Sequence, residues 1–229
     1  MKGFSVLLAV WLAATTAAAE TITVVDDTGR LTPAQAGRLG DQAAREYGKL
    51  KVLFKADAGP VTLRVRAAGV ARHLPPATIH VPIRLVQKGT AITAHELAHL
   101  LTQGWASPLL KEGLAVYAQD LIGEQRGWPN YRRTVHGAAR HWTSRPDAPI
   151  TGPGEADKAL AQPRKGQARL RQAAYAVAGS WVKWIIEAKM NGDLDRFMAE
   201  LYRTNAYKAA TGRRYPALAR EWRRFIAGR

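Results

Sequence analysis

The sequence predicts an α+β protein in which a small sheet comes first and helices fill the second half. Two observations carry this prediction. Apolar and other residues alternate with a period of two in residues 61–65 and 79–85, as expected for half-buried strands, and residues 21–25 also have the composition of a short strand. After Gly89 the apolar period becomes helical and stays so to the C-terminus. We find no internal repeat and no low-complexity tract, so the segregation of strands and helices decides the class.

The first half also carries helix and strand-end signals. Thr32 followed by Pro33 is a typical N-cap and first helical position, which predicts a helix over residues 34–50. Pro82 lies within the third alternating run, residues 79–85, and has no backbone N–H to donate to a neighbouring strand. We therefore expect this run to be an edge strand of the sheet.

The second half contains several segments with apolar residues at helical spacing. The predicted helices cover residues 92–104, 107–122, 131–142, 170–188, 194–202 and 216–226. Prolines and glycines are concentrated between them in residues 145–166, which predicts a long, irregular loop there.

Composition limits the chemistry that the chain can perform. The 229 residues are 47% hydrophobic, enough for a globular domain with its own core. The absence of cysteine excludes disulfides, thiolate metal ligands and cysteine nucleophiles. Lys and Arg exceed Asp and Glu by 16, which indicates either a solvated basic surface or one that binds an anionic envelope polymer. No nucleic-acid motif accompanies this charge, so we expect no specific nucleic-acid partner.

The N-terminus has the features of a secretory signal peptide over residues 1–19. Lys2 precedes an apolar stretch, residues 4–14, that is too short to span a membrane, and three alanines precede Glu20. The alternative is an anchor that stays uncleaved. We expect a secreted or periplasmic protein whose mature part, residues 20–229, forms one domain without a transmembrane segment.

The motif His95-Glu96-Leu97-Ala98-His99 is the most informative pattern in the chain. Histidines at positions i and i+4 project from one face of a helix, so both rings can reach one metal ion. Imidazole nitrogen is a good zinc ligand. Glu96 points slightly aside, which suits contact with a water rather than with the metal.

Glu112 is the candidate third ligand. His99 and Glu112 lie six or seven residues on either side of a turn near Ala106, so a helical hairpin would bring them to the same height. Gly113 would let the two helices approach closely. Two histidines and one carboxylate with an open fourth position describe a catalytic rather than a structural zinc site. The alternative is a carboxylate that only interacts with the dipole of its helix.

The sequence from His95 to His99, followed by Ser107-Pro-Leu-Leu-Lys-Glu-Gly-Leu-Ala-Val-Tyr117, resembles the gluzincin zinc metallopeptidases, especially the peptidase MA-like group. The resemblance covers roughly residues 78–226. It implies a zincin-like fold and zinc held by His95, His99 and Glu112. It also implies that Glu96 acts as general base in the hydrolysis of a peptide or protein substrate.

The same resemblance implies two further features. Tyr175 lies 63 residues after Glu112, where related peptidases have a tyrosine that stabilises the oxyanion; the alternative is a tyrosine of the core. The expected edge strand, residues 79–85, would pair with an extended substrate peptide by β-augmentation.

Two other functions stay open at this level. One is a non-catalytic, basic envelope-binding module with a vestigial or structural zinc site. The other is an amidase-like hydrolase of cell-wall peptides, which shares the same chemistry. The remaining polar motifs are expected to have ordinary roles: a turn at Asp27-Thr28-Gly29, packing or surface roles for His73, His80, His136 and His141, and no nucleophile at Ser180.

Overall fold

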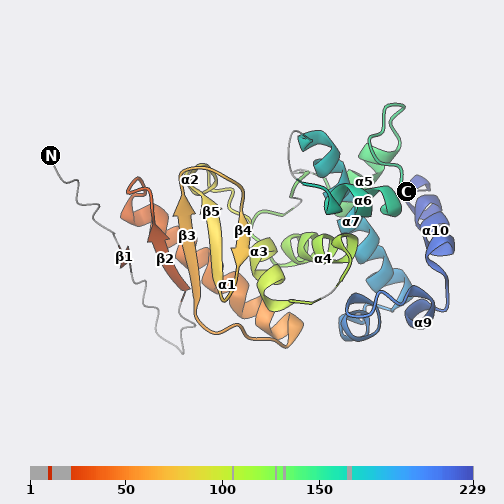
Figure 1. Ribbon diagram of the computed structural model, residues 1–229, viewed down its shortest axis with the longest axis horizontal. Helices are drawn as coiled ribbons and strands as arrows, with labels where there is room; N and C mark the ends of the chain where they lie inside the picture. The colour runs from red at the N-terminus through yellow and green to blue at the C-terminus, as the bar shows by residue number, and fades with distance from the viewer. Residues whose placement is uncertain are drawn as a thin grey trace. The chain divides into compact units, whose positions relative to one another are not determined.

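The computed structural model describes residues 10–11, 22–104, 106–126, 128–130, 133–163 and 167–228. Apart from Val10–Trp11, the predicted signal peptide lies outside the described residues. The strands come early and helices make up most of the rest, which confirms the α+β class (Figure 1). No helix in the described ranges is both long and apolar enough to cross a bilayer. The chain divides into two compact units, Met1–Thr102 with Ile122–Gln125, and Gln103–Leu121 with Arg126–Arg229.

The first unit contains a mixed sheet with helices packed against it (Figure 1). Its elements are β1 (Val10–Trp11), β2 (Ile22–Asp26), α1 (Pro33–Phe54), β3 (Val61–Arg66), β4 (Arg72–Leu74), β5 (Thr78–Pro82), α2 (Ile83–Gln87) and α3 (Thr93–Leu101). The strand order is β1-β2-β3-β5-β4. Strands β2, β3 and β5 are parallel, whereas β1 and β4 run antiparallel to their neighbours.

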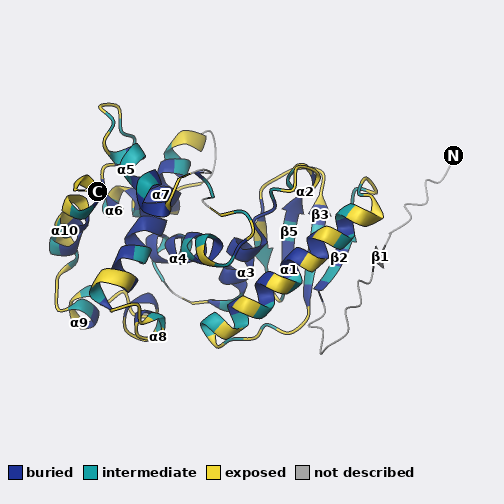
Figure 2. Cartoon of the chain, turned by 180° about the vertical axis from the view of Figure 1, so that it is seen from behind, coloured by how far each residue is buried: buried dark blue, intermediate teal, exposed yellow. Residues whose placement is uncertain are grey.

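Helix α1 begins where the sequence predicts and continues to Phe54. The Thr32 hydroxyl accepts from the Gln35 backbone N–H at 3.2 Å, and the Gln35 side chain accepts from the Thr32 N–H at 2.9 Å. This reciprocal capping box satisfies two donors that the helix itself leaves open. One face of α1 is buried, including Leu39 and Tyr47, and the other is exposed, as the alternating colours along α1 in Figure 2 show.

Strand β5 is not an edge strand, contrary to the prediction for residues 79–85. Ile79 pairs with Leu63 of β3 on one side and with His73 of β4 on the other. Pro82 is the last residue of β5, so its missing donor falls where the ladder ends, and the chain then turns into α2. Both sides of β5 are occupied, so the expected pairing of this segment with a substrate peptide is wrong. The edge strand on that side of the sheet is the short β4.

The second unit is helical, with α7 at its centre packed against α4, α5 and α6 (Figure 1). Its elements are α4 (Pro108–Leu121), α5 (Val135–Thr143), α6 (Pro153–Ala161), α7 (Ala168–Trp184), η1 (Ile185–Lys189), α8 (Leu194–Arg196), η2 (Phe197–Tyr202), α9 (Tyr207–Thr211) and α10 (Tyr215–Ala227). Two predictions need correction here. The irregular loop predicted for residues 145–166 contains α6, and the helix predicted from residue 131 is described only from Val135.

Helices α4 and α7 approach each other through two glycines. A Cβ at Gly113 would lie 2.5 Å from the Ala178 carbonyl oxygen and 2.6 Å from Val182 Cγ2. A Cβ at Gly179 would collide with the side chain of Val116. Gly113 was expected to admit the helix of the two histidines, but the close approach that it permits is to α7. Gly113 therefore lets the backbones of the two helices approach each other, and Gly179 makes room for the side chain of Val116.

Candidate metal centre

Helix α3 carries His95, Glu96 and His99, and it is buried along nearly its whole length. Eight of its nine residues are buried, Glu96 among them. An isolated helix of this length is not stable in water, so α3 depends on what surrounds it. It packs against α1 and β4 within the first unit.

A buried polar network holds the start of α3. Ile92 makes no side-chain capping bond, and Thr93 instead donates its hydroxyl hydrogen to Glu46 of α1. Gln42 Nε2 donates to Thr93 Oγ1 at 2.9 Å and to Glu46 Oε1 at 3.1 Å, and the Glu124 backbone N–H donates to Glu46 Oε1 at 2.8 Å. Glu46 is 1% exposed, and this burial raises the pKa of its carboxyl. A carboxylate near a helix N-terminus also interacts favourably with the helix dipole.

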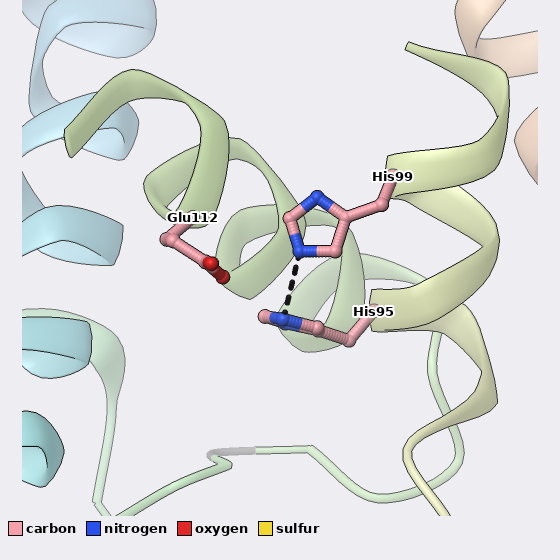
Figure 3. A group of neighbouring side chains, drawn as sticks. All are labelled: His95, His99 and Glu112. Atoms are coloured by element: carbon pink, nitrogen blue, oxygen red, sulfur yellow. Dashed lines mark hydrogen bonds between the residues drawn. The ribbon is translucent and has the colours of Figure 1, made fainter. Parts of the chain in front are cut away.

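The two histidines of α3 are arranged as a chelating pair. Their Nε2 atoms lie 3.2 Å apart, and their rings meet edge to face with centroids 4.7 Å apart (Figure 3). Two nitrogens bound tetrahedrally to zinc at about 2.05 Å would be about 3.3 Å apart. His95 is only 2% exposed and His99 5%, so both residues are shielded from solvent. The histidine pair can therefore chelate a single metal ion.

Glu112 on α4 completes the group. One ligand atom from each of His95, His99 and Glu112 lies within 4.8 Å of the other two (Figure 3). These three residues can hold a metal ion. The set of two imidazoles and one carboxylate suits zinc and related transition metals.

Tyr175, the predicted oxyanion donor, lies on α7 in the same unit as Glu112. Its side chain is 8% exposed, and its ring centroid lies 4.9 Å from that of Trp128. The Arg171 guanidinium donates a hydrogen bond to its hydroxyl oxygen at 3.1 Å. Tyr175 thus combines a packed ring with a polar end that is already engaged by a cation.

Sequence reasoning missed a third histidine near the pair. The ring of His73 on β4 lies 5.5 Å from that of His99, centroid to centroid. His73 was expected to have an ordinary role. Strand β4 has only three residues, which is too short for an alternating pattern in the sequence to identify it. Its place follows from pairing with β5, which no local pattern reveals.

Ser180 and His136 are another two residues of catalytic types that the structure brings together. His136 Nδ1 lies 2.9 Å from Ser180 Oγ, and Trp222 Nε1 donates to the same oxygen at 3.1 Å. Ser180 is fully buried, so no substrate can reach its hydroxyl. Of the two roles expected for His136, surface or packing, the structure shows packing in the core.

Comparison with models of known protein families finds no match to this chain, and comparison with curated proteins finds none either.

Proposed function

We propose that this protein is a zinc-dependent peptidase that hydrolyses peptide bonds with Glu96 as general base. The observation that supports this most is the grouping of the ligand atoms of His95, His99 and Glu112 within 4.8 Å. A buried glutamate stands directly beside the first histidine on the same helix. That combination is what hydrolytic zinc sites require, since a purely structural site has no use for the additional carboxylate.

Each residue then has a defined task. His95, His99 and Glu112 would hold zinc, which when bound supplies Lewis acidity that polarises a carbonyl and makes water acidic near neutral pH. Glu96 removes a proton from the attacking water and passes it to the leaving amine. Tyr175 donates a hydrogen bond to the carbonyl oxygen as that oxygen becomes negative.

The protein acts outside the cytoplasm in this proposal. The signal-peptide features of residues 1–19 favour export to the periplasm or the medium, where the substrates would be peptides or proteins of the cell envelope or its surroundings. The excess of 16 basic over acidic residues favours substrates or neighbours with negative charge.

Glu96→Gln tests the function directly. Gln preserves size and packing but does not accept a proton at neutral pH. We expect the variant to keep about one zinc per chain and its melting temperature, while cleavage of a mixed peptide library drops by about two to four orders of magnitude. Glu155→Gln, which changes an exposed carboxylate on α6, is the matched control and should cleave like wild type.

Two further arms separate the possible failures. Glu112→Ala should lose most of its zinc by metal analysis, because two ligands bind the ion weakly. A chelator should abolish cleavage by the wild type. Cleavage that resists the chelator, or that Glu96→Gln retains in full, would contradict the mechanism. A wild type that binds zinc but cleaves no peptide at any pH would favour the non-catalytic binding module.

A further inference from the structure

Arg171 is a buried cation on α7, one helical turn before Tyr175. Its side chain is only 8% exposed. Nη1 donates to the carbonyl oxygens of Ala159 and Gln162 at the end of α6, at 3.4 and 3.3 Å. Nη2 donates to the Tyr175 hydroxyl oxygen at 3.1 Å, and Cζ lies 5.3 Å from the centroid of the Tyr175 ring. The guanidinium therefore joins the end of one helix to the phenol of another.

The direction of the hydrogen bond between Arg171 and Tyr175 is unambiguous. A guanidinium has only donors and no acceptor, so the phenol oxygen must be the acceptor. The single hydrogen of the phenol cannot be used toward Arg171 and must be directed elsewhere. Because that hydrogen lies in the plane of the ring, a donor on one side of the oxygen favours the orientation toward the other side.

The cation also changes the strength of the phenol as a donor. A positive group that donates to the oxygen draws electron density from it and polarises the O–H bond, and successive hydrogen bonds strengthen one another in this way. The ring itself has little freedom, since Trp128 packs against it at 4.9 Å between centroids. The Tyr175 hydroxyl is thus both oriented and polarised before any substrate binds.

We propose that Arg171 is a positioning residue for the hydrolysis: it keeps Tyr175 as a hydrogen-bond donor directed at the oxyanion of the substrate. This inference rests on the proposed function, because it assigns Arg171 a task only if Tyr175 has one. The competing explanation is that Arg171 only satisfies the last carbonyls of α6, as cations at helix C-termini commonly do. The two explanations differ in whether the effect of Arg171 depends on the Tyr175 hydroxyl.

A double-mutant cycle separates them. We expect Arg171→Met to lower kcat about tenfold with little change in KM, and Tyr175→Phe to lower kcat about a hundredfold. The double variant should be no slower than Tyr175→Phe alone, because no hydroxyl remains to be oriented. A purely structural Arg171 would slow both backgrounds by the same factor, and that additive result would overturn the proposal. Arg169→Met, an exposed cation on the same helix, is the control and should match wild type.

A spectroscopic measurement on zinc-free protein is independent of catalysis. Labelling tyrosine at 13Cζ gives one NMR signal per ring, and the signal missing from Tyr175→Phe identifies Tyr175. Arg171→Met should move this signal more than any other tyrosine signal, because the ring carbon reports the hydrogen bonds of its oxygen. An unmoved signal would overturn the proposal whatever the kinetics show. An inactive wild type would instead refute the peptidase function, and the positioning role with it.

Discussion

Replacing Glu46 tests how α3 is held in place. Glu46 accepts hydrogen bonds from Thr93, Gln42 and the backbone of Glu124 at a site that is 1% exposed. Glu46→Ala removes the acceptor for all three donors. A buried donor without an acceptor costs about 1–3 kcal/mol, whereas Gln42 keeps its bonds to the Ala91 carbonyl oxygen and to Thr93 Oγ1. We therefore expect Glu46→Ala to lower the free energy of unfolding by about 3–5 kcal/mol.

Glu46→Gln isolates the charge of the carboxylate. Gln keeps the shape and one acceptor but presents an amide to one of the donors, which should cost about 1–2 kcal/mol. Burial raises the pKa of Glu46 above its ordinary value of 4.5, so the folded state binds the proton more tightly than the unfolded state. The contribution of Glu46 to stability is then complete below pH 4.5 and is lost as the pH rises through the folded-state pKa.

The assay is urea unfolding of wild type and Glu46→Gln, followed by tryptophan fluorescence, at a series of pH values from 4.5 to 8. The free energy of unfolding of wild type, relative to the variant, should be highest at the acidic end and decline toward neutral pH. Asp41→Asn, an exposed carboxylate on the same helix, controls for general charge effects. A difference between wild type and Glu46→Gln that does not vary with pH would refute the argument from burial.

Two other predictions follow from the structure. Gly113→Ala should lower the free energy of unfolding by about 2–4 kcal/mol, because its Cβ meets a backbone carbonyl at 2.5 Å, while Gly104→Ala, with open space around it, should be near neutral in the same melts. The Lys51 ammonium holds the pKa of Asp57 at about 2. NMR titration should find this pKa in wild type and a higher one in Lys51→Met. Because the pKa of Asp57 is lowered in the folded state, the stability that this carboxylate provides should be lost as the pH falls from about 4 through 2. An unchanged pKa of Asp57 in Lys51→Met would contradict the ion pair as the cause.

The parts of the fold that local signals specify were predictable from the sequence. Thr32 and Pro33 mark the start of α1 because capping depends on residues within one turn. The spacing of His95 and His99 requires only that the segment be helical, and α3 meets that requirement. Glu112 was predicted as a ligand because it lies about as many residues after the turn near Ala106 as His99 lies before it. Equal residue counts give equal heights on two antiparallel helices, since the rise per residue of a helix is constant.

Other features depend on contacts between distant segments and left no local pattern. Ile83 and Leu85 continue the alternation of β5, yet they lie in α2, since apolar residues two apart can also be buried by a short helix. Gly152 and Pro153 look like loop residues but begin α6. The hydrogen bond from Thr93 to Glu46 joins residues 47 positions apart, so no window along the sequence contains it.

The contact between α4 and α7 fixes how Glu112 on α4 and Tyr175 on α7 lie relative to each other. It does so through two glycines, Gly113 and Gly179, which have no side chain where the helices meet. Sliding α4 by one residue along its axis would shift it by about 1.5 Å and turn it by about 100°, replacing Gly113 with a side chain where the Ala178 carbonyl now lies. Gly179 imposes the same restriction from the opposite helix. The positions of Glu112 and Tyr175 relative to each other are thus fixed by steric exclusion at two points. Other side chains between α4 and α7 can be exchanged for residues of similar size. A side chain at Gly113 or Gly179 would push the helices apart and so move the Glu112 carboxylate relative to the Tyr175 phenol.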